Sequence, residues 1–279
     1  MTLREWLRKG EQQLGTGPHA DRARRDTETL LLHLVGKNRA WLIAHLDEDF
    51  AGCTAIRFAS LLDRRHRGEP IQYIVGETEF FGLPFNVTPD VLIPRPETEH
   101  LVEAALEYAR RNTAGTIVDV GTGSGAIAIS LALELGRGLM ASDVSVGALA
   151  VAQRNAKTHN ALVDFFACDL LEAIRPGSID LLVSNPPYVP GEDSANMQAE
   201  VRDWEPHVAL FAGDTGFEIY RRLIAQACSA VKAGGRLYFE LGYRSLDGVK
   251  EILATARWGD FEVISDLAGW PRVIGATHI

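Results

Sequence analysis

The sequence has few of the residues that build disulfide frameworks, metal sites and membrane spans. Only three cysteines occur, Cys53, Cys168 and Cys228, and their wide separation argues against both a disulfide framework and a CxxC metal motif. The eight histidines include no HExxH pair and no cluster with cysteine, so we expect no bound metal. No apolar stretch approaches the roughly 20 residues of a membrane-spanning helix. We therefore expect reduced thiols and no membrane anchor.

Targeting signals are also lacking in the first residues. The segment MTLREWLRKGEQQL mixes acidic and basic side chains, without a secretory apolar stretch and without the acid-free composition of a transit peptide. We therefore expect a cytoplasmic protein. With 46% hydrophobic and 23% charged residues, the chain has the composition of a folded protein of one large or two ordinary domains.

Basic residues are outnumbered, which limits the possible partners. The chain carries 28 Lys and Arg against 37 Asp and Glu, a net charge of -9. Residues 1–75 hold 12 basic against 10 acidic side chains, a net of +2, whereas residues 76–279 hold 16 against 27, a net of -11. Nucleic acids are bound chiefly by lysine and arginine that neutralise phosphates. Nucleic acid is therefore an unfavoured partner for the acidic part of the chain.

The hydrophobic pattern divides the chain into a helical part and an α/β part. Residues 1–76 predict a bundle of four or five short helices, with Trp6 and Trp41 in its core. Residues 77–93 carry aromatic and β-branched residues around a glycine and a proline, which favours a β-hairpin linker. A larger domain is predicted over residues 94–279.

Apolar runs of strand length alternate with helical patterns in the larger domain. Strands are predicted at residues 116–120, 139–142, 163–167, 179–184, 236–241, 261–265 and 272–276. Helices are predicted at residues 126–135, 146–159, 217–231 and 246–256. Because strand and helix alternate, the sequence predicts an α/β fold around a parallel sheet.

A glycine-rich loop, DVGTGSG, joins the first of these strands to the next helix. Gly121, Gly123 and Gly125 allow a tight turn and the close approach of a ligand. The spacing is GxGxG, unlike the GxGxxG of dinucleotide binders, and the GK[ST] ending of a phosphate-binding P-loop is missing. S-adenosylmethionine therefore ranks above NAD and ATP as the cofactor, although such a turn can also use glycines for packing alone.

Two aspartates follow the next two strands. Asp143 lies 18 residues beyond Gly125, where a carboxylate can accept hydrogen bonds from ribose hydroxyls. Asp169 is placed at the carboxyl end of the following strand, where it could accept from an adenine amino group. An aspartate there can also cap a helix over residues 170–174.

The segment Asn185-Pro-Pro-Tyr188 ends a buried strand and carries the most specific signal. Pro186 and Pro187 fix φ and have no N–H, so this backbone is rigid and the Pro186 carbonyl is available to a ligand. The Asn185 side-chain oxygen is a second acceptor, and the Tyr188 ring can stack on a planar group. These features indicate a site for a planar amide or amino nitrogen. A loop with ordinary Asn-Pro turn chemistry is the alternative.

Methyl transfer to such a nitrogen is mainly a problem of orientation. The lone pair of an amide nitrogen is delocalised, and it must meet the sulfonium methyl in line. Asn185 and Pro186 can each accept one of the two N–H bonds and stabilise the positive charge that develops on nitrogen. No general base is needed if the proton leaves after transfer.

Together these motifs resemble the HemK/PrmC family, the protein-(glutamine-N5) methyltransferases that act on the GGQ motif of class I peptide chain release factors. The resemblance covers nearly the whole chain and rests on RRDTETLLLHLVGKNRAWLIAH, GEPIQYIVGETEFFGLPFNV, LIPRPETE, DVGTGSGAIAISLA, SNPPYVP and GGRLYFELGY. It implies a Rossmann-like class I methyltransferase domain with a mostly parallel seven-stranded sheet, preceded by a helical substrate-recognition domain and a β-hairpin. We expect a monomeric enzyme that uses S-adenosylmethionine and modulates translation termination.

The resemblance also implies a set of site residues. The cofactor would be held by Gly121, Thr122, Gly123, Ser124, Gly125, Asp143, Asp169, Leu170 and Asn185. Catalysis and binding of the glutamine amide would fall to Asn185, Pro186, Pro187 and Tyr188. Leu170 departs from the family, where relatives often carry a bulkier aromatic residue. The site would be bordered by Pro94, Arg95, Pro96, Glu97 and Thr98, although proline followed by acids is also an ordinary helix start.

Two other functions are compatible with parts of the sequence. A nucleic-acid methyltransferase acting on adenine or guanine amino groups could use the same Asn-Pro-Pro-aromatic acceptors for a flipped base. The net charge of -11 over residues 76–279 opposes that function. A non-catalytic scaffold that retained the fold is opposed by the intact glycine loop, by Asp143 and by the Asn-Pro-Pro-Tyr segment.

Overall fold

The chain forms two compact units in the computed structural model, which describes residues 1–50 and 52–279. The first unit comprises Met1–Glu77 together with Gln198–Trp204, and the second comprises Thr78–Met197 and Glu205–Ile279. No helix among these described residues is long and apolar enough to cross a membrane.

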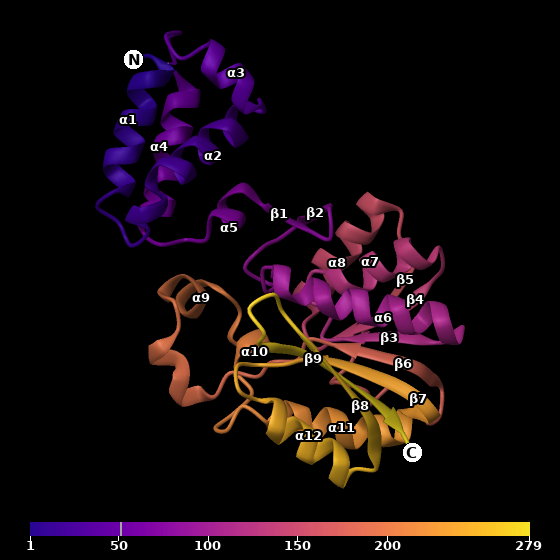
Figure 1. The fold of residues 1–279 in the computed structure, drawn as a ribbon. Coiled ribbons are helices and arrows are strands. Elements are labelled where there is room, and N and C mark those ends of the chain that lie inside the picture. The colour runs from indigo at the N-terminus through magenta and orange to yellow at the C-terminus, as the bar shows by residue number, and fades with distance from the viewer. Residues whose placement is uncertain (51) are drawn as a thin grey trace. The chain divides into compact units, whose positions relative to one another are not determined.

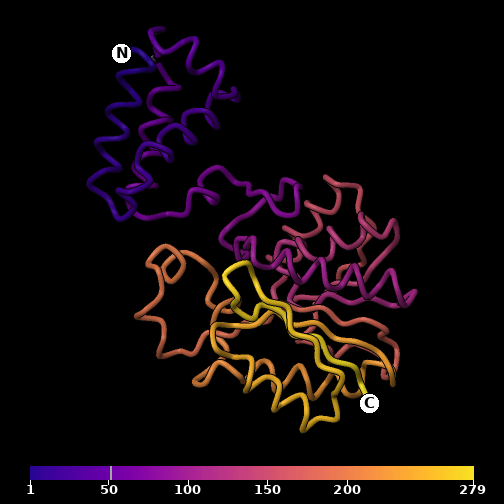
Figure 2. The backbone as a smooth tube through the Cα atoms, viewed as in Figure 1, coloured from indigo at the N-terminus to yellow at the C-terminus, as the bar shows by residue number. Residues whose placement is uncertain are grey.

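The first unit is a bundle of helices around an apolar core (Figure 2). Its helices are α1 (Leu3–Leu14), a 3-10 helix (Ala20–Arg22), α2 (Ala23–Val35), α3 (Arg39–Ala44), α4 (Cys53–His66), α5 (Ile71–Val75) and α9 (Ala199–Trp204). Leu30, Phe58 and Leu62 are fully buried in the core. Trp6 and Trp41, which were predicted in the core, are partly buried and pack against it.

Local sequence sets where α1 and α2 begin and end. Thr2 and Glu5 form a reciprocal capping box at the start of α1, in which the Thr2 hydroxyl accepts from the Glu5 N–H at 3.2 Å. Helix α2 ends at Gly36, whose φ of 63° is the left-handed conformation that glycine adopts without strain.

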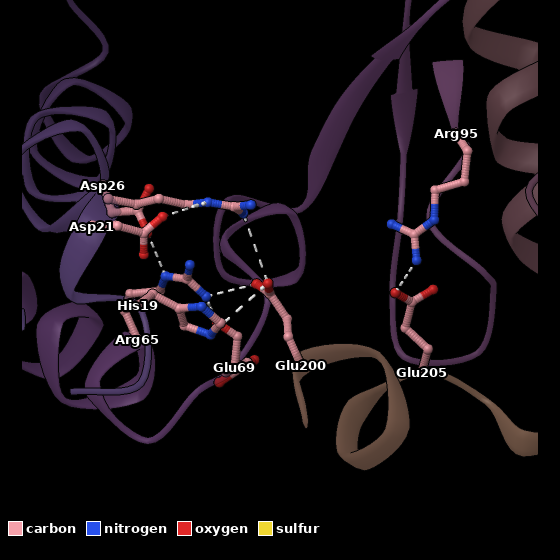
Figure 3. Close-up of polar contacts among 9 residues, drawn as sticks. His19, Asp21, Asp26, Arg65, Glu69, Arg95, Glu200 and Glu205 are labelled. Atoms are coloured by element: carbon pink, nitrogen blue, oxygen red, sulfur yellow. Dashed lines mark hydrogen bonds and ion pairs between the residues drawn. The ribbon is translucent and has the colours of Figure 1, made fainter. Parts of the chain in front are cut away.

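A buried arginine links three segments of the first unit (Figure 3). The Arg65 guanidinium, on α4, donates to Asp26 of α2 at 2.6 Å and to Glu200 of α9 at 2.7 Å. It also donates to the backbone carbonyl of Glu69 at 2.9 Å. Only 1% of the Arg65 side chain is exposed, so these partners replace the water that a charged group loses on burial. The Glu200 carboxylate has a further neighbour in His19, at 3.8 Å.

The second unit is built on a seven-stranded sheet. Its strands are β3 (Ile117–Val120), β4 (Leu139–Asp143), β5 (Val163–Ala167), β6 (Ile179–Ser184), β7 (Val231–Glu240), β8 (Trp258–Ser265) and β9 (Pro271–His278). Their order is β5-β4-β3-β6-β7-β9-β8. The first five pair in parallel, and β9 runs antiparallel to both β7 and β8. The predicted mostly parallel sheet is therefore confirmed.

Helices cover both faces of this sheet (Figure 1). One face carries α6 (Glu99–Asn112), α7 (Ala126–Leu135) and α8 (Val146–His159); the other carries α11 (Glu218–Ala230) and α12 (Leu246–Thr255). Successive side chains of a strand point to opposite faces, so Ile117 packs into one core and Val118 into the other. The remaining elements are the hairpin β1 (Glu77–Phe80) and β2 (Leu83–Asn86), 3-10 helices at Pro96–Thr98 and Gly191–Asn196, and α10 (His207–Leu210).

The strand order places the ligand-binding edge of the sheet. Strand β3 lies between β4 and β6, so the chain leaves β3 in one direction across the sheet and returns on its other side. Such a switch point opens a crevice at the carboxyl ends of the strands. Val120, at the end of β3, pairs with Ser142 of β4 and Ser184 of β6. The loops that follow these three strands therefore converge.

Candidate active site

A cleft of about 280 Å³ lies at the carboxyl ends of β3, β4, β5 and β6. It is lined by the glycine loop after β3, by Asp143 at the end of β4, by Asp169 and Leu170 after β5, and by Asn185 after β6. The structure thus brings together residues spread over more than sixty positions of the sequence. Within the described chain, no group of three or more His, Cys, Asp or Glu side chains is arranged to hold a metal.

The three glycines of the glycine loop have two different roles. Gly121, Gly123 and Gly125 have φ of 72°, 54° and 83°, which disfavours any other residue. A Cβ added at Gly125 would lie 2.9 Å from Ile129 and 3.2 Å from Ala152, so this glycine permits close packing of α7 on α8. A Cβ at Gly121 or Gly123 would meet no atom within 4 Å. These two glycines therefore keep part of the cleft open.

Two aspartates hold the loop in shape. Asp143 accepts from the N–H of Gly123 at 2.8 Å and from the N–H of Ser145 at 2.9 Å. Burial raises the pKa of Asp143, because water solvates the charged carboxylate better than the cleft does. Asp119 is fully buried beneath the loop and accepts from the Thr122 hydroxyl at 2.6 Å. Burial raises the pKa of Asp119 to about 7.

Asp169 and Leu170 lie on the side of the cleft formed by the chain after β5. One oxygen of Asp169 accepts from the Arg222 guanidinium of α11 at 2.7 Å. The pair is largely exposed, and the second carboxylate oxygen retains acceptor capacity for a ligand. Leu170 has a φ of 53°, unusual for a branched residue. Residues 170–174 form turns, so the helix that Asp169 was alternatively expected to cap does not form.

The Asn-Pro-Pro-Tyr segment borders the cleft through Asn185 and Pro187. The Asn185 amide NH₂ donates to the Thr98 hydroxyl at 3.3 Å. Pro186 is buried, and Tyr188 lies behind the cleft wall, where its hydroxyl donates to Glu240 at 3.4 Å. Burial raises the pKa of the Tyr188 phenol well above its usual value, which keeps the hydroxyl protonated as a donor.

The Ile-Pro-Arg-Pro-Glu-Thr-Glu segment also reaches the cleft, through Arg95 and Thr98. Arg95 forms an ion pair with Glu205, which Figure 3 shows, and Glu205 accepts as well from the N–H of Ile93 at 3.2 Å. Thr98 caps α6 by position, yet its hydroxyl makes no capping hydrogen bond. It donates instead to Glu240, at 2.5 Å. The segment is therefore more than a helix start.

Three acidic residues near the site were not singled out from the sequence. Asp119 and Glu205 are 0% and 3% exposed, and Glu240 is 4% exposed. Buried carboxylates are rare unless they are paired, so such residues mark places with a specific task. Asp119 is the first residue of the DVGTGSG motif, so the sequence did contain a signal by which it could have been singled out. Nothing near Glu205 or Glu240 in the sequence indicates their side-chain partners, because these partners lie between 52 and 142 residues away.

The sheet order, the glycine loop after β3, the acidic residue ending β4 and the Asn-Pro-Pro-Tyr segment after β6 define a Rossmann-like, S-adenosylmethionine-dependent methyltransferase. Models of the PrmC N-terminal domain and of the methyltransferase small domain match residues 5–76 and 98–201. A methyltransferase structure from Pyrococcus furiosus superimposes with a TM-score of 0.53 at 17% identity, over 71% of this chain and 90% of that chain, which shows the shared fold.

Curated relatives narrow this class to one family. A release factor glutamine methyltransferase of Koribacter versatilis is 45% identical, over 90% of this chain and 90% of its own. One of Moorella thermoacetica is 41% identical, over 98% of this chain and 97% of its own. The chain belongs to the family of release factor glutamine methyltransferases.

The cofactor is S-adenosylmethionine, and the cleft fits it. The open space over Gly121 and Gly123 can receive a ligand that a side chain would displace. Asp143 and Asp169 supply carboxylate acceptors beside it, suited to hydroxyl and amino groups and to a cofactor that bears positive charge on sulfur and on its amino group. Apolar residues such as Ile127 and Leu170 also line the cleft, and such residues suit the apolar parts of a ligand.

Substitution of Gly123 by alanine is expected to weaken S-adenosylmethionine binding by about tenfold or more, since the new methyl group would occupy the open part of the cleft. Gly136→Ala is the matched control. Gly136 also has a positive φ, 63°, and also has nothing within 4 Å of an added Cβ, but it lies at the far end of α7. Calorimetric titration should give Gly136→Ala the wild-type affinity. Equal weakening in both variants would mean that backbone strain, and not the cleft, controls binding.

Proposed function

We propose that this protein transfers a methyl group from S-adenosylmethionine to the side-chain amide nitrogen of the glutamine in the GGQ motif of class I release factors. The observation that carries the proposal is that Asn185 and Pro187, which follow β6, line the cofactor cleft. Membership of a family whose curated relatives are named for this activity supports it.

In the proposed reaction the protein orients a poor nucleophile. The Asn185 side-chain oxygen and the Pro186 carbonyl each accept one N–H of the glutamine amide, which directs the lone pair along the line of transfer. Tyr188 does not line the cleft, and its hydroxyl is tied to Glu240 behind the corner, so its stacking on the planar group stays a prediction from the sequence. S-adenosylmethionine supplies an electrophilic methyl group when it is bound. The amide nitrogen releases its proton to water after transfer, so the site needs no general base.

The cofactor contacts in this proposal are those predicted from the sequence. The glycine loop (residues 121–125) lines the cofactor, Asp143 binds the ribose, and Asp169 and Leu170 lie beside the adenine. Asn185 is the remaining predicted contact. All of them line the cleft except Gly125, which packs against Ile129 and Ala152.

We also propose that different parts of the chain have different roles. Residues 1–76 would recognise the release factor, residues 77–93 would link the two parts, and residues 94–279 would carry out the chemistry. The helical part carries a small net positive charge over residues 1–75, against -11 over residues 76–279.

Transfer of radiolabelled methyl groups tests the function directly. The purified protein is incubated with labelled S-adenosylmethionine and with a release factor, its glutamine-to-alanine GGQ variant or bulk RNA. Label on the intact release factor alone is the expected result. Label on RNA would replace the proposal with a nucleic-acid methyltransferase. A folded protein that neither binds cofactor nor transfers label would be a scaffold.

A further inference from the structure

Three polar side chains form a chain of hydrogen bonds that ends behind the reacting corner. The Asn185 amide NH₂ donates to the Thr98 hydroxyl oxygen at 3.3 Å. The Thr98 hydroxyl donates in turn to the Glu240 carboxylate at 2.5 Å. Thr98 and Glu240 are 5% and 4% exposed, so water has little access to either. The hydrogen bonds therefore all run in one direction, from the amide to the carboxylate.

The direction follows from the number of protons available. An ionised carboxylate only accepts, and a threonine hydroxyl has a single proton to donate. Once that proton is directed to Glu240, the Thr98 oxygen can only accept. The group of Asn185 that faces Thr98 must then be the NH₂. The Asn185 side-chain oxygen is left to face away from Thr98, toward the substrate. A flipped amide would place two donors against each other at the substrate.

We propose that Thr98 and Glu240 are positioning residues that fix the orientation of the Asn185 amide, so that its oxygen, and not its NH₂, faces the nitrogen to be methylated. The inference deepens the proposed function and rests on it. Neither residue touches the reacting atoms in this role. The buried acid acts through the hydroxyl, and the hydroxyl acts through Asn185.

The surroundings of Glu240 support a dedicated role. Tyr188 donates to its carboxylate, and the Tyr220 hydroxyl of α11 donates to its backbone carbonyl at 2.6 Å. The negative charge of Glu97 raises the pKa of Glu240, and the positive charge of Arg272 lowers it. Burial dominates and raises the pKa of Glu240 to about 7. A protonated Glu240 could donate to Thr98 and free the hydroxyl to donate to Asn185, which would permit the flipped amide.

The first test compares Thr98→Val with Thr98→Ser. Valine keeps the shape of threonine without its hydroxyl, so kcat for methylation of a release factor should fall by about tenfold or more, the equivalent of one lost hydrogen bond. Serine keeps the hydroxyl and should retain kcat within about twofold. KM for the release factor and the affinity for S-adenosylmethionine should be unchanged in both. A residue that only supports the fold would instead lower thermal stability without this split between kcat and KM.

The second test is the pH profile of Glu240→Gln. In the wild type, kcat should rise as pH increases through about 7, because the ionised acid enforces the productive amide. Glutamine can accept or donate, so the variant should have a lower kcat and no step near that pH.

The outcomes separate this inference from the proposed function. Wild-type transfer to the release factor establishes the function independently of any variant. Full kcat in Thr98→Val, equal losses in valine and serine, or an unchanged pH step in the kcat of Glu240→Gln at saturating S-adenosylmethionine would each overturn the positioning role while leaving the function standing.

Discussion

Asn185→Ala is expected to lower kcat for release factor methylation by about 10²- to 10³-fold, the typical effect of removing one acceptor or donor aimed at developing charge. The side-chain oxygen at the end of β6 would be lost, and the amide nitrogen of the substrate would keep only the Pro186 acceptor. S-adenosylmethionine should still bind with an affinity within about threefold of wild type, because the glycine loop and Asp143 are untouched. Single-turnover methyl transfer and calorimetric titration measure the two quantities separately.

Asn112→Ala is a suitable control for this variant. Asn112 is an exposed asparagine at the carboxyl end of α6, and its NH₂ donates to the Tyr108 carbonyl of the same helix. It should retain the wild-type rate. Near-normal turnover in Asn185→Ala would remove Asn185 from the mechanism, and with it the proposed roles of Thr98 and Glu240.

Arg65→Met is expected to destabilise the first unit by about 3–5 kcal/mol, as is typical when one member of a buried ionic group is removed. Methionine has a similar volume, but it would leave Asp26 buried with 5% of its side chain exposed and no cation beside it. Glu200, 11% exposed, would keep His19 nearby. Chemical denaturation should therefore show the loss in the transition of the helical unit.

Two further variants identify the cause. Arg57→Met changes an exposed arginine on the same helix α4 and should change the unfolding free energy by no more than about 0.5 kcal/mol. Adding Asp26→Leu to Arg65→Met removes the stranded carboxylate and should recover much of the stability. A double variant as unstable as Arg65→Met would show that lost packing, and not an unpaired charge, causes the effect.

Much of the second unit could be predicted from the sequence because its signals are local. Strands such as Ile179–Ser184 are mostly apolar and almost fully buried, as expected for a sheet covered on both faces. The helix predicted at residues 126–135 has those bounds in the structure. The roles of the predicted cofactor and substrate residues remain a proposal. Their loops follow neighbouring strands of the sheet, and the alternation of strands and helices in the sequence already predicted a parallel sheet with its ligand-binding loops at one edge.

Other features were out of reach because they depend on partners that are distant in the sequence. Residues 191–210 gave no clear pattern, and nothing in them indicated that α9 packs with the N-terminal helices and provides Glu200 to Arg65. The Pro-Glu-Thr-Glu segment suggested a helix start, and α6 does begin there. The sequence did not indicate that its threonine hydroxyl reaches Glu240, 142 residues further along the chain.

The sequence by itself determined the fold class and the cofactor, and it predicted the chemistry of the reacting corner. Hydrophobic period, glycine spacing and the Asn-Pro-Pro-Tyr segment are properties of short stretches of chain. Only the tertiary structure decided which buried charges meet and which way the Asn185 amide is held. Hydrogen bonds between residues far apart in sequence depend on where the packed sheet and helices bring them, and burial then makes a single arrangement of protons favourable. The sequence therefore indicates the chemistry of the reacting corner, and the tertiary structure adds the orientation of its groups.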